Sequence, residues 1–184
     1  MEQTDFLSVY HETSPLATKT ALFLRRTENP RKTAYDLLAR GVAQFFGQNT
    51  LPEIARTPLG QPYFPALPQC RFSISHSRHY ALCALSGGRV GCDVEELKPR
   101  LASLPERCFS PAELERWRAM GGGWEGFYPL WTEKEAAGKY LGTGLRGDLR
   151  AISPPPGTRV SHFRVGDAFL TLCSDMELAF TDGI

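Results

Sequence analysis

Apolar residues recur at helical spacing between positions 31 and 46 and at alternating positions between 71 and 95. Before the first segment, Asn29-Pro30 offers an N-cap and a proline for the first helical turn, and Gly47 offers a C-cap. We therefore predict an amphipathic helix from Arg31 to Phe46. The alternation predicts three strands at 71–75, 79–85 and 89–95, which short turns would join into an antiparallel meander.

The second half of the chain again has helical segments followed by strands. Ser110-Pro111-Ala112-Glu113 has the form of a capping box and predicts a short helix that ends near Met120. A longer helix is expected from Trp124 to Tyr140, kinked or restarted near Pro129. Strand-like runs follow at 149–153, 159–165, 168–173 and 177–180. This order predicts an α+β fold with largely antiparallel sheets.

Three carboxylates form the sharpest chemical constellation. In the strand at 89–95, Asp93 and Glu95 share one face because successive side chains alternate. With Glu135 on the later helix they supply three oxygen donors, which suit Mg²⁺, with Mn²⁺ as the alternative. Taken alone, the spacing still favours a simpler interpretation: a solvated strand face, and a helix-supporting pair of Glu135 with Lys139.

Charge is balanced over the whole chain but not locally. The 184 residues include 21 Lys and Arg against 20 Asp and Glu, so no global field favours nucleic acid or membrane. Positions 19–40 nevertheless hold six basic residues against two acidic ones, and Lys134 and Lys139 flank Glu135. Arg31 falls in the first turn of its helix, where the helix dipole disfavours a cation unless an anion is also held there. Carboxylates that hold a metal ion, together with Lys and Arg side chains that bind phosphate groups, suit a polyphosphate ligand.

The cysteines and the hydropathy bear on the compartment. The five cysteines form no C-x-x-C pair, so we expect free thiols in a reducing environment. The first ten residues carry two acids and no basic segment, and the longest apolar stretch, Tyr80 to Leu85, is too short to span a bilayer. We expect a cytoplasmic protein.

Two other motifs are candidates for an anion-binding, catalytic or nucleotide-binding site. His76 lies between Ser75 and Ser77 at the end of a strand, where imidazole, hydroxyl and backbone N–H groups can face an anion. A nucleophilic Ser–His pair is disfavoured, because adjacent strand residues point to opposite faces and no G-x-S-x-G elbow surrounds them. Gly142-x-Gly144-x-x-Gly147 has dinucleotide-binding spacing but follows a helix, without the βαβ unit that such a site needs.

Three segments in order resemble the motifs of the Sfp-type 4′-phosphopantetheinyl transferases. They are Ser75-His76-Ser77, Gly91-Cys92-Asp93-Val94-Glu95, and Trp131-Thr132-Glu133-Lys134-Glu135-Ala136-Ala137-Gly138-Lys139. The resemblance implies two similar α+β halves in a pseudo-twofold arrangement, with coenzyme A and Mg²⁺ between them. Here the halves would be residues 1–88, on the nucleotide side, and 89–184, on the metal and pyrophosphate side, so a monomer would suffice.

The resemblance also implies a reaction. The 4′-phosphopantetheine arm of coenzyme A would pass to a serine of an apo acyl or peptidyl carrier protein, releasing adenosine 3′,5′-bisphosphate. Asp93, Glu95 and Glu135 would hold Mg²⁺ against the pyrophosphate. Lys139, together with Lys134, would stabilise the leaving phosphate, and Glu135, or a metal-bound water that it orients, is the candidate base.

Coenzyme contacts follow from the same resemblance. Arg31 and His76 would bind the 3′-phosphate, with Arg26 as a weaker addition, and Gly60-Gln61-Pro62 stands where the family has Gly-Lys-Pro near the adenine. Gln61 replaces a basic residue there, which puts this contact in doubt. The full set of expected coenzyme-binding residues is Arg26, Arg31, Gly60, Gln61, Pro62, Ser75, His76, Lys134 and Lys139.

Two other functions were considered. A non-catalytic carrier-protein or coenzyme A binding module is the first alternative, and the complete set Asp93, Glu95, Glu135 and Lys139 argues against it. A nucleic-acid binder using the bases between 25 and 32 is the second, and it is disfavoured by the near-zero net charge and by the lack of stacking aromatics beside those bases. An apolar patch around Phe109 to Trp117 is the expected docking surface for a carrier, although a helix that covers the core would show the same pattern.

Overall fold

The computed structural model describes residues 18–184. The first ten residues, whose charges contributed to the expected location, lie outside this range. In chain order the elements are β1 (Lys19–Arg26), α1 (Pro30–Phe46), β2 (Ala55–Arg56), β3 (Pro62–Tyr63), β4 (Arg71–His76), β5 (Tyr80–Ser86), β6 (Val90–Glu96), α2 (Leu104–Cys108), α3 (Pro111–Ala119), α4 (Trp124–Leu141), the 3₁₀ helix η3 (Leu149–Ala151), β7 (Arg159–Val165), β8 (Ala168–Ser174) and β9 (Glu177–Asp182).

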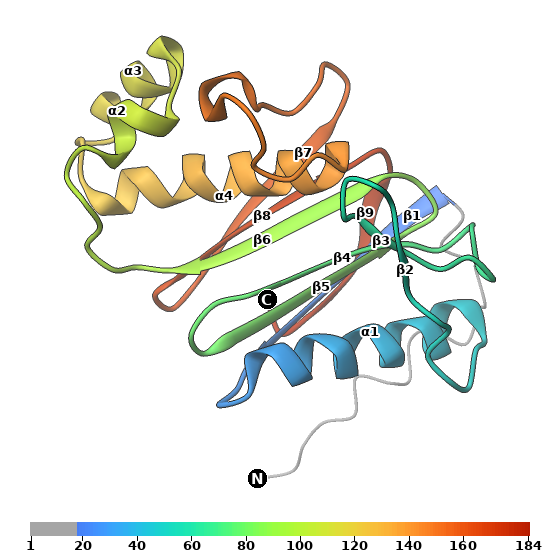
Figure 1. Ribbon diagram of the computed structural model, residues 1–184. Helices are drawn as coiled ribbons and strands as arrows, with labels where there is room; N and C mark the ends of the chain where they lie inside the picture. The colour runs from blue at the N-terminus through green and yellow to red at the C-terminus, as the bar shows by residue number, and fades with distance from the viewer. Residues whose placement is uncertain (1–17) are drawn as a thin grey trace, which may run out of the picture.

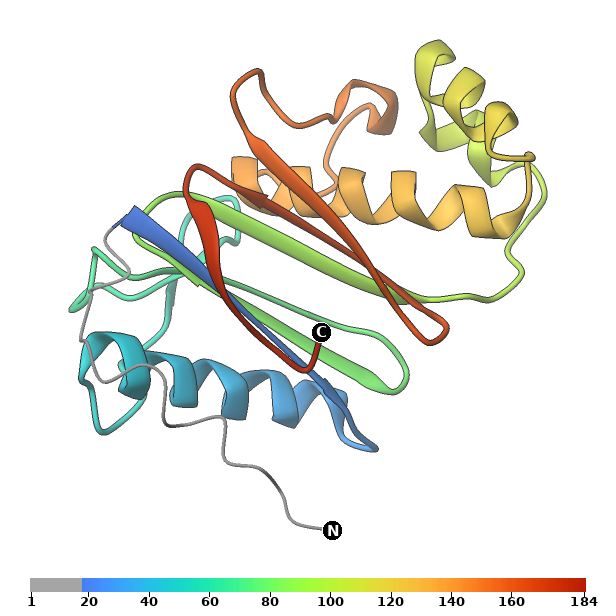
Figure 2. The ribbon, with the colours of Figure 1, turned by 180° about the vertical axis from the view of Figure 1, so that it is seen from behind.

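Two sheets lie between two long helices (Figures 1 and 2). One sheet has the strand order β4-β5-β1-β9, and the other has the order β6-β8-β7. Helix α1 covers the outer face of the first sheet, and α4 covers the outer face of the second (Figure 1). The inner faces of the sheets meet in a shared apolar layer. The predicted α+β class with mainly antiparallel sheets is confirmed, and the pairing of β1 with β9 is parallel.

The first predicted meander is only partly correct. Strands β4 and β5 pair antiparallel as expected, but β6 leaves that sheet and pairs with β8. The alternation within β6 was predicted correctly, since Val90, Cys92 and Val94 all lie in the apolar layer. Because that face packs against the first sheet, β6 lies in the layer opposite β4 and β5.

Most helix predictions are confirmed at their termini. Helix α1 ends at Gly47 in the left-handed conformation, and Ser110 with Glu113 forms both hydrogen bonds of a capping box at α3. Asn29 occupies the N-cap position of α1 without a side-chain cap bond. Helix α4 continues through Pro129 instead of restarting there.

One predicted strand is wrong and one real strand was missed. Of the predicted strand at 149–153, Leu149–Ala151 form the 3₁₀ helix η3, and residues 152–153 lie in no strand. Asp148 Oδ1 caps this helix by accepting a hydrogen bond from the Arg150 N–H at 3.0 Å. Strand β1 was not predicted, since its buried residues are consecutive and do not alternate. Strand β9, from the C-terminal end of the chain, joins the sheet of β1. The first sheet therefore contains strands from both predicted halves. The division at residue 88 stays a prediction.

The state of the cysteines agrees with the expectation of free thiols. All five cysteines are buried and free. Within residues 18–184, no helix combines the length and the apolar character that crossing a membrane requires.

Candidate functional site

Asp93, in the middle of β6, is the centre of the site. It is 3% exposed, and its Oδ1 accepts hydrogen bonds from Ser75 Oγ at 2.6 Å and Lys139 Nζ at 2.8 Å. Lys139 Nζ also donates to the Cys92 carbonyl oxygen at 3.0 Å. Three residues that the sequence predicted from separate motifs are therefore in direct contact, across β4, β6 and α4.

Gly91 allows α4 to approach β6 closely enough for this contact. A Cβ atom at position 91 would lie 2.1 Å from the Ala136 carbonyl oxygen and 2.4 Å from the Tyr140 nitrogen, both backbone atoms of α4. No side chain fits in that space. The glycine two residues before Asp93 thus fixes the distance across which Lys139 reaches the strand.

Glu135 lies one turn before Lys139 on α4, and its side chain forms no hydrogen bond or ion pair with another residue of 18–184. Burial, followed by the negative charge of Asp93, raises the pKa of Glu135 to about 7; Glu95 adds to this effect and Lys139 opposes it. The negative charges of Asp93 and Glu95 therefore act on the Glu135 carboxylate, which no cation within residues 18–184 pairs with directly.

Glu95 contacts a residue that the sequence analysis missed. Arg100 Nη2 donates to Glu95 Oε2 at 3.0 Å, and Lys98 Nζ is 4.0 Å from the same oxygen. Burial and the Asp93 charge still raise the pKa of Glu95 above its ordinary value, against the effect of Arg100. Arg100 lies in the loop after β6, outside any motif, so no spacing signal could have identified it.

The acidic cluster fits a hard divalent cation in its donor chemistry. Asp93 Oδ2 is buried and has no hydrogen-bond partner, although an unpaired buried carboxylate oxygen is costly. Oxygen donors of this kind are the ligands that Mg²⁺ accepts. In residues 18–184 no three His, Cys, Asp or Glu side chains are already arranged around one point as metal ligands. Lys139 and Arg100 form ion pairs with two of the acids, Asp93 and Glu95.

Burial opposes the charged form of Lys139, but Asp93, Cys92 and Glu135 together outweigh burial and raise the pKa of the ammonium group. Lys139 therefore stays charged at neutral pH. It also lines a cavity of about 240 Å³, which we call the hairpin cleft, together with Gly60, Gln61 and Pro62 of the β2–β3 hairpin. The structure thus brings the predicted adenine-binding segment to the same cavity as Lys139.

Gln61 fastens the hairpin to the end of α4. Its Nε2 donates to the Lys139 carbonyl oxygen at 3.1 Å, and its Oε1 lies 2.5 Å from where a Cβ at Gly142 would be. Gly142 ends α4 in the left-handed conformation, with φ of 74°, so glycine is required there for both reasons. The residue that stands in place of the family's lysine therefore makes a contact within the protein.

The predicted 3′-phosphate contacts lie together but outside this cavity. Arg26 ends β1, His76 ends β4, and their partners in β5 are the neighbours Tyr80 and Ala81. Arg31 lies in the first turn of α1, which follows β1 in the chain. All three predicted contacts are exposed, so this end of the sheet presents a basic surface to solvent.

Two expectations do not agree with the positions that the structure gives. The Lys134 side chain is fully buried, with its Nζ 2.7 Å from Glu113 Oε1 and 2.7 Å from the Ile152 carbonyl oxygen, so it fastens α3 to α4 and does not reach the cleft. Phe109 is 1% exposed and belongs to the core, so it is not part of an exposed patch. The exposed apolar side chains of that region are Leu101 and Met120.

Comparisons with known proteins were made with the whole sequence. A sequence model of the 4′-phosphopantetheinyl transferase superfamily matches residues 89–178. The chain is similar to a 4′-phosphopantetheinyl transferase of Bacillus subtilis (38% identity over 96 residues, 51% of this chain and 43% of the relative). It is also similar to the 4′-phosphopantetheinyl transferase Sfp of Bacillus subtilis strain 168 (31% over 139 residues, 73% and 62%).

A third relative, the 4′-phosphopantetheinyl transferase AcpT of Salmonella typhi, is similar over most of both chains, at 30% identity over 169 residues, which is 88% of this chain and 86% of the relative. By contrast, the chain spans only 43% and 62% of the lengths of the two Bacillus subtilis relatives named above. The matched segment 89–178 contains β6 and α4, and with them all three clustered acids and Lys139. The chain belongs to the 4′-phosphopantetheinyl transferase superfamily.

Proposed function

We propose that this protein transfers the 4′-phosphopantetheine arm of coenzyme A to a serine of an apo acyl or peptidyl carrier protein, in a Mg²⁺-dependent reaction. The observation that carries the proposal is the contact of Ser75, Asp93 and Lys139, with the unpaired Glu135 carboxylate one helical turn away. An acidic cluster beside a charged lysine at the edge of a cavity suits a substrate that carries a pyrophosphate. The family membership supports the same reaction.

In the proposed reaction Glu135 is the base that takes the proton of the carrier serine. The serine oxygen of the carrier forms a bond to the phosphorus that bears pantetheine, and the bond from that phosphorus to the bridging oxygen of the pyrophosphate breaks. The electron pair leaves with adenosine 3′,5′-bisphosphate, and the serine proton passes to the Glu135 carboxylate. Glu135 suits this role because neither an arginine nor a lysine ties it in an ion pair.

Lys139 and the remaining acids hold the substrate in place. The Lys139 ammonium, kept charged by Asp93, stabilises negative charge on the departing phosphate. Asp93, Glu95 and Glu135 would hold Mg²⁺, which when bound neutralises charge on the pyrophosphate. Ser75 orients Asp93 through its 2.6 Å hydrogen bond. This positioning role replaces the direct coenzyme contact expected for Ser75.

The cleft and the basic edge would bind the rest of coenzyme A. Gly60, Gln61 and Pro62 line the hairpin cleft, where they suit the adenine, and Arg31, His76 and Arg26 form a basic surface that suits the 3′-phosphate. Because one chain supplies both sheets around the site, a monomer would suffice. The five buried free thiols support a cytoplasmic location.

A mass measurement tests the reaction. The purified chain is incubated with coenzyme A, Mg²⁺ and a panel of apo carrier proteins from fatty-acid, polyketide and peptide synthesis. We expect the intact mass of at least one carrier to increase by one phosphopantetheine group, and a chelator to prevent the increase. No increase on the panel, under conditions where a known transferase modifies it, would contradict the proposal. Coenzyme A binding without transfer would favour the alternative of a non-catalytic binding module.

A further inference from the structure

Glu96 is a buried carboxylate to which the proposed reaction gives no role. It is the last residue of β6 and is only 7% exposed. Because side chains alternate along a strand, Glu96 shares the face of Val94 and not that of Glu95. A charged side chain is rarely buried without partners, so the contacts of Glu96 indicate what it does.

Both oxygens of Glu96 hold the turn between β4 and β5. Oε2 accepts a hydrogen bond from the His79 backbone N–H at 2.8 Å, and Oε1 lies 2.7 Å from Nδ1 of the His79 ring. Hydrogen bonds to a charged acceptor are about twice as strong as neutral ones. Since β6 belongs to the second sheet and the turn to the first, Glu96 fastens a turn of one sheet to the other sheet.

The backbone around Glu96 is itself held in place. Glu96 pairs with Ala168 of β8, and the next N–H, that of Leu97, donates to the Asp167 carbonyl oxygen at 2.8 Å. The carboxylate therefore reaches the β4–β5 turn from a fixed point of the second sheet.

The same turn is bonded to the loop between β1 and α1, which lies at the same end of the first sheet (Figure 1). The Thr27 N–H donates to the His79 carbonyl oxygen at 2.8 Å. Thr27 Oγ1 accepts from the Asn29 N–H at 3.1 Å and lies 3.0 Å from Thr33 Oγ1. A chain of contacts therefore runs from Glu96 through His79 and Thr27 to the first turn of α1.

This chain of contacts connects the segments that carry the three exposed basic residues. Arg26 directly precedes Thr27, and Arg31 lies in the first turn of α1. His76 ends β4, three residues before His79. Like charges repel one another, and a site whose residues are already held together binds an anion at a lower ordering cost.

We propose that Glu96 is a positioning residue for the binding of the 3′-phosphate of coenzyme A. By holding His79 it fixes the β4–β5 turn and the β1–α1 loop, and with them the three basic residues relative to one another. Glu96 itself would touch neither the coenzyme nor the reacting atoms. The inference rests on the proposed function, because it requires that this basic surface binds the coenzyme.

Charge and positioning predict opposite effects when Glu96 is replaced. A carboxylate near a basic surface repels an anion, so loss of its charge alone should strengthen the binding of a phosphate. Loss of the two His79 contacts should weaken it, because the basic residues must then be ordered when the ligand binds. Glu96→Ala loses the charge and the contacts. Glu96→Gln loses the charge but can keep both contacts, since an amide oxygen can accept from the His79 N–H and an amide nitrogen can donate to Nδ1.

Isothermal titration with coenzyme A and with 3′-dephospho-coenzyme A isolates the 3′-phosphate, because the two ligands differ only there. The full wild-type chain should bind coenzyme A more tightly. In Glu96→Ala the Kd for coenzyme A should rise about tenfold, equivalent to the loss of about one charge-assisted hydrogen bond, while the Kd for the dephospho ligand stays nearly unchanged. Glu96→Gln should retain the wild-type preference.

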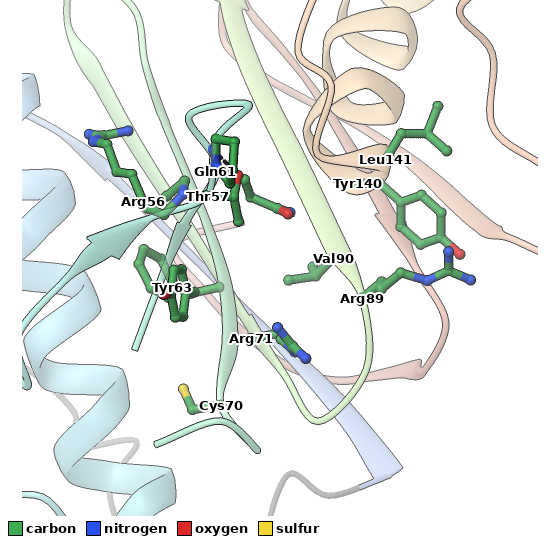
Figure 3. Close-up of a pocket in the computed structure, with 13 residues that line it drawn as sticks. Arg56, Thr57, Gln61, Tyr63, Cys70, Arg71, Arg89, Val90, Tyr140 and Leu141 are labelled. Carbon is green, nitrogen blue, oxygen red and sulfur yellow. Dashed lines mark hydrogen bonds between the residues drawn. The ribbon is translucent and has the colours of Figure 1, made fainter. Parts of the chain in front are cut away.

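Asp175 provides the matched control at the other end of β6. Its Oδ2 also accepts from a backbone N–H and a side chain of one residue, Arg89, at 3.0 and 3.4 Å. Arg89 directly precedes β6 and lies beside the Tyr140 ring (Figure 3). Asp175→Ala should therefore lose similar contacts and keep the wild-type ratio of the two dissociation constants.

The wild-type chain supplies a measurement that does not depend on a variant folding. Coenzyme A should slow the exchange of the Thr27 and His79 amide hydrogens with solvent more than 3′-dephospho-coenzyme A does. Equal protection by the two ligands, or equal binding of both by the wild-type chain, would overturn the positioning role.

The variants give further outcomes that decide the inference. A Glu96→Ala protein with the wild-type preference or with tighter binding of coenzyme A, failure of Glu96→Gln to retain the preference, or an equal loss of preference in Asp175→Ala would overturn it. Each of these results would leave the proposed function standing. A wild-type chain that binds neither ligand would contradict both the inference and the proposed function.

Discussion

The two sheets contact each other in two different ways. Through most of their facing surfaces the contact is apolar, with Leu22 and Leu82 of the first sheet against Leu170 of the second. At the β4 edge the contact is polar: Ser73 Oγ accepts a hydrogen bond from the Cys92 N–H at 3.0 Å, and Ser75 Oγ donates to Asp93. We therefore expect the apolar contact to supply most of the stability and the polar contact to supply the proposed chemistry.

Strand β6 takes part in both contacts because its side chains alternate. Val90, Cys92 and Val94 enter the apolar layer, while Asp93 and Gly91 face α4. One strand can thus be fixed by burial on one face and carry an acidic cluster on the other. Substitutions in the two contacts should accordingly have separable effects on the free energy of unfolding and on the transfer rate.

Leu82→Ala should have the largest effect on stability. Leu82 is fully buried in the apolar contact, and its truncation should lower the free energy of unfolding by about 3 kcal/mol. Urea denaturation measures this loss, and Leu101→Ala, at a side chain that is 71% exposed, is the control expected to stay within about 0.5 kcal/mol. Transfer activity per folded molecule should not change. A specific loss of activity in Leu82→Ala would break the distinction between the two contacts.

Ser75→Ala should affect activity more than stability. It removes one hydrogen bond to Asp93, so we expect about 1 kcal/mol of destabilisation and a transfer rate lowered about tenfold. The matched control is Ser86→Ala, since the Ser86 hydroxyl is buried and accepts a hydrogen bond from Thr20 Oγ1 at 2.9 Å, away from the acidic cluster. It should show a similar loss of stability with normal transfer. Equal rates for the two variants would show that Ser75 has only a structural role.

An ion-pair cluster at the other edge of the first sheet should have the smallest effect. Asp182 of β9 accepts hydrogen bonds from Arg25, with the shortest at 2.7 Å, and lies 2.8 Å from Arg40. Partial burial favours the neutral acid, but Arg25 and Arg40 outweigh it and lower the pKa of Asp182 below its ordinary value. A lowered folded-state pKa gives stability that is present above the unfolded pKa of about 4 and is lost as pH falls through the folded pKa.

The corresponding experiment compares wild type with Asp182→Asn. At pH 7 the variant should be less stable by about 0.5 kcal/mol, and the difference should be lost as pH falls through the lowered folded-state pKa of Asp182. Urea denaturation at several pH values measures it. A difference that is independent of pH would mean that Asp182 acts through packing and not through its charge.

Local patterns predicted much of the fold, and long-range packing decided the rest. The capping residues identified α3, and the alternation in β6 identified both of its faces correctly, because these features depend on neighbours in the chain. The choice of partner for β6 depends on burial between distant segments, so its transfer to the second sheet was missed. Strand β1 was missed because both of its faces are covered, which removes the alternation that marks a strand.

The candidate site shows the same limit. The residue types and the resemblance of their motifs to a known family indicated Asp93, Glu135 and Lys139, and the structure brings these motifs together. The sequence analysis did not predict that the Lys134 side chain contacts Glu113 and not the cleft. Neighbouring residues of a helix point in different directions, so Lys134 and Glu135 lie on different faces of α4. Arg100 was also missed, since its contact with Glu95 depends on the path of a loop.

The rate of phosphopantetheine transfer in a Glu135→Gln variant tests the central claim most directly. The amide keeps the size of the side chain but cannot take the serine proton, so the rate should fall by about 100-fold or more, with the free energy of unfolding nearly unchanged. Glu125→Gln, on the same helix but 65% exposed and paired with Arg164, should retain the wild-type rate. A Glu135→Gln protein that modifies the carrier as fast as wild type would contradict the account.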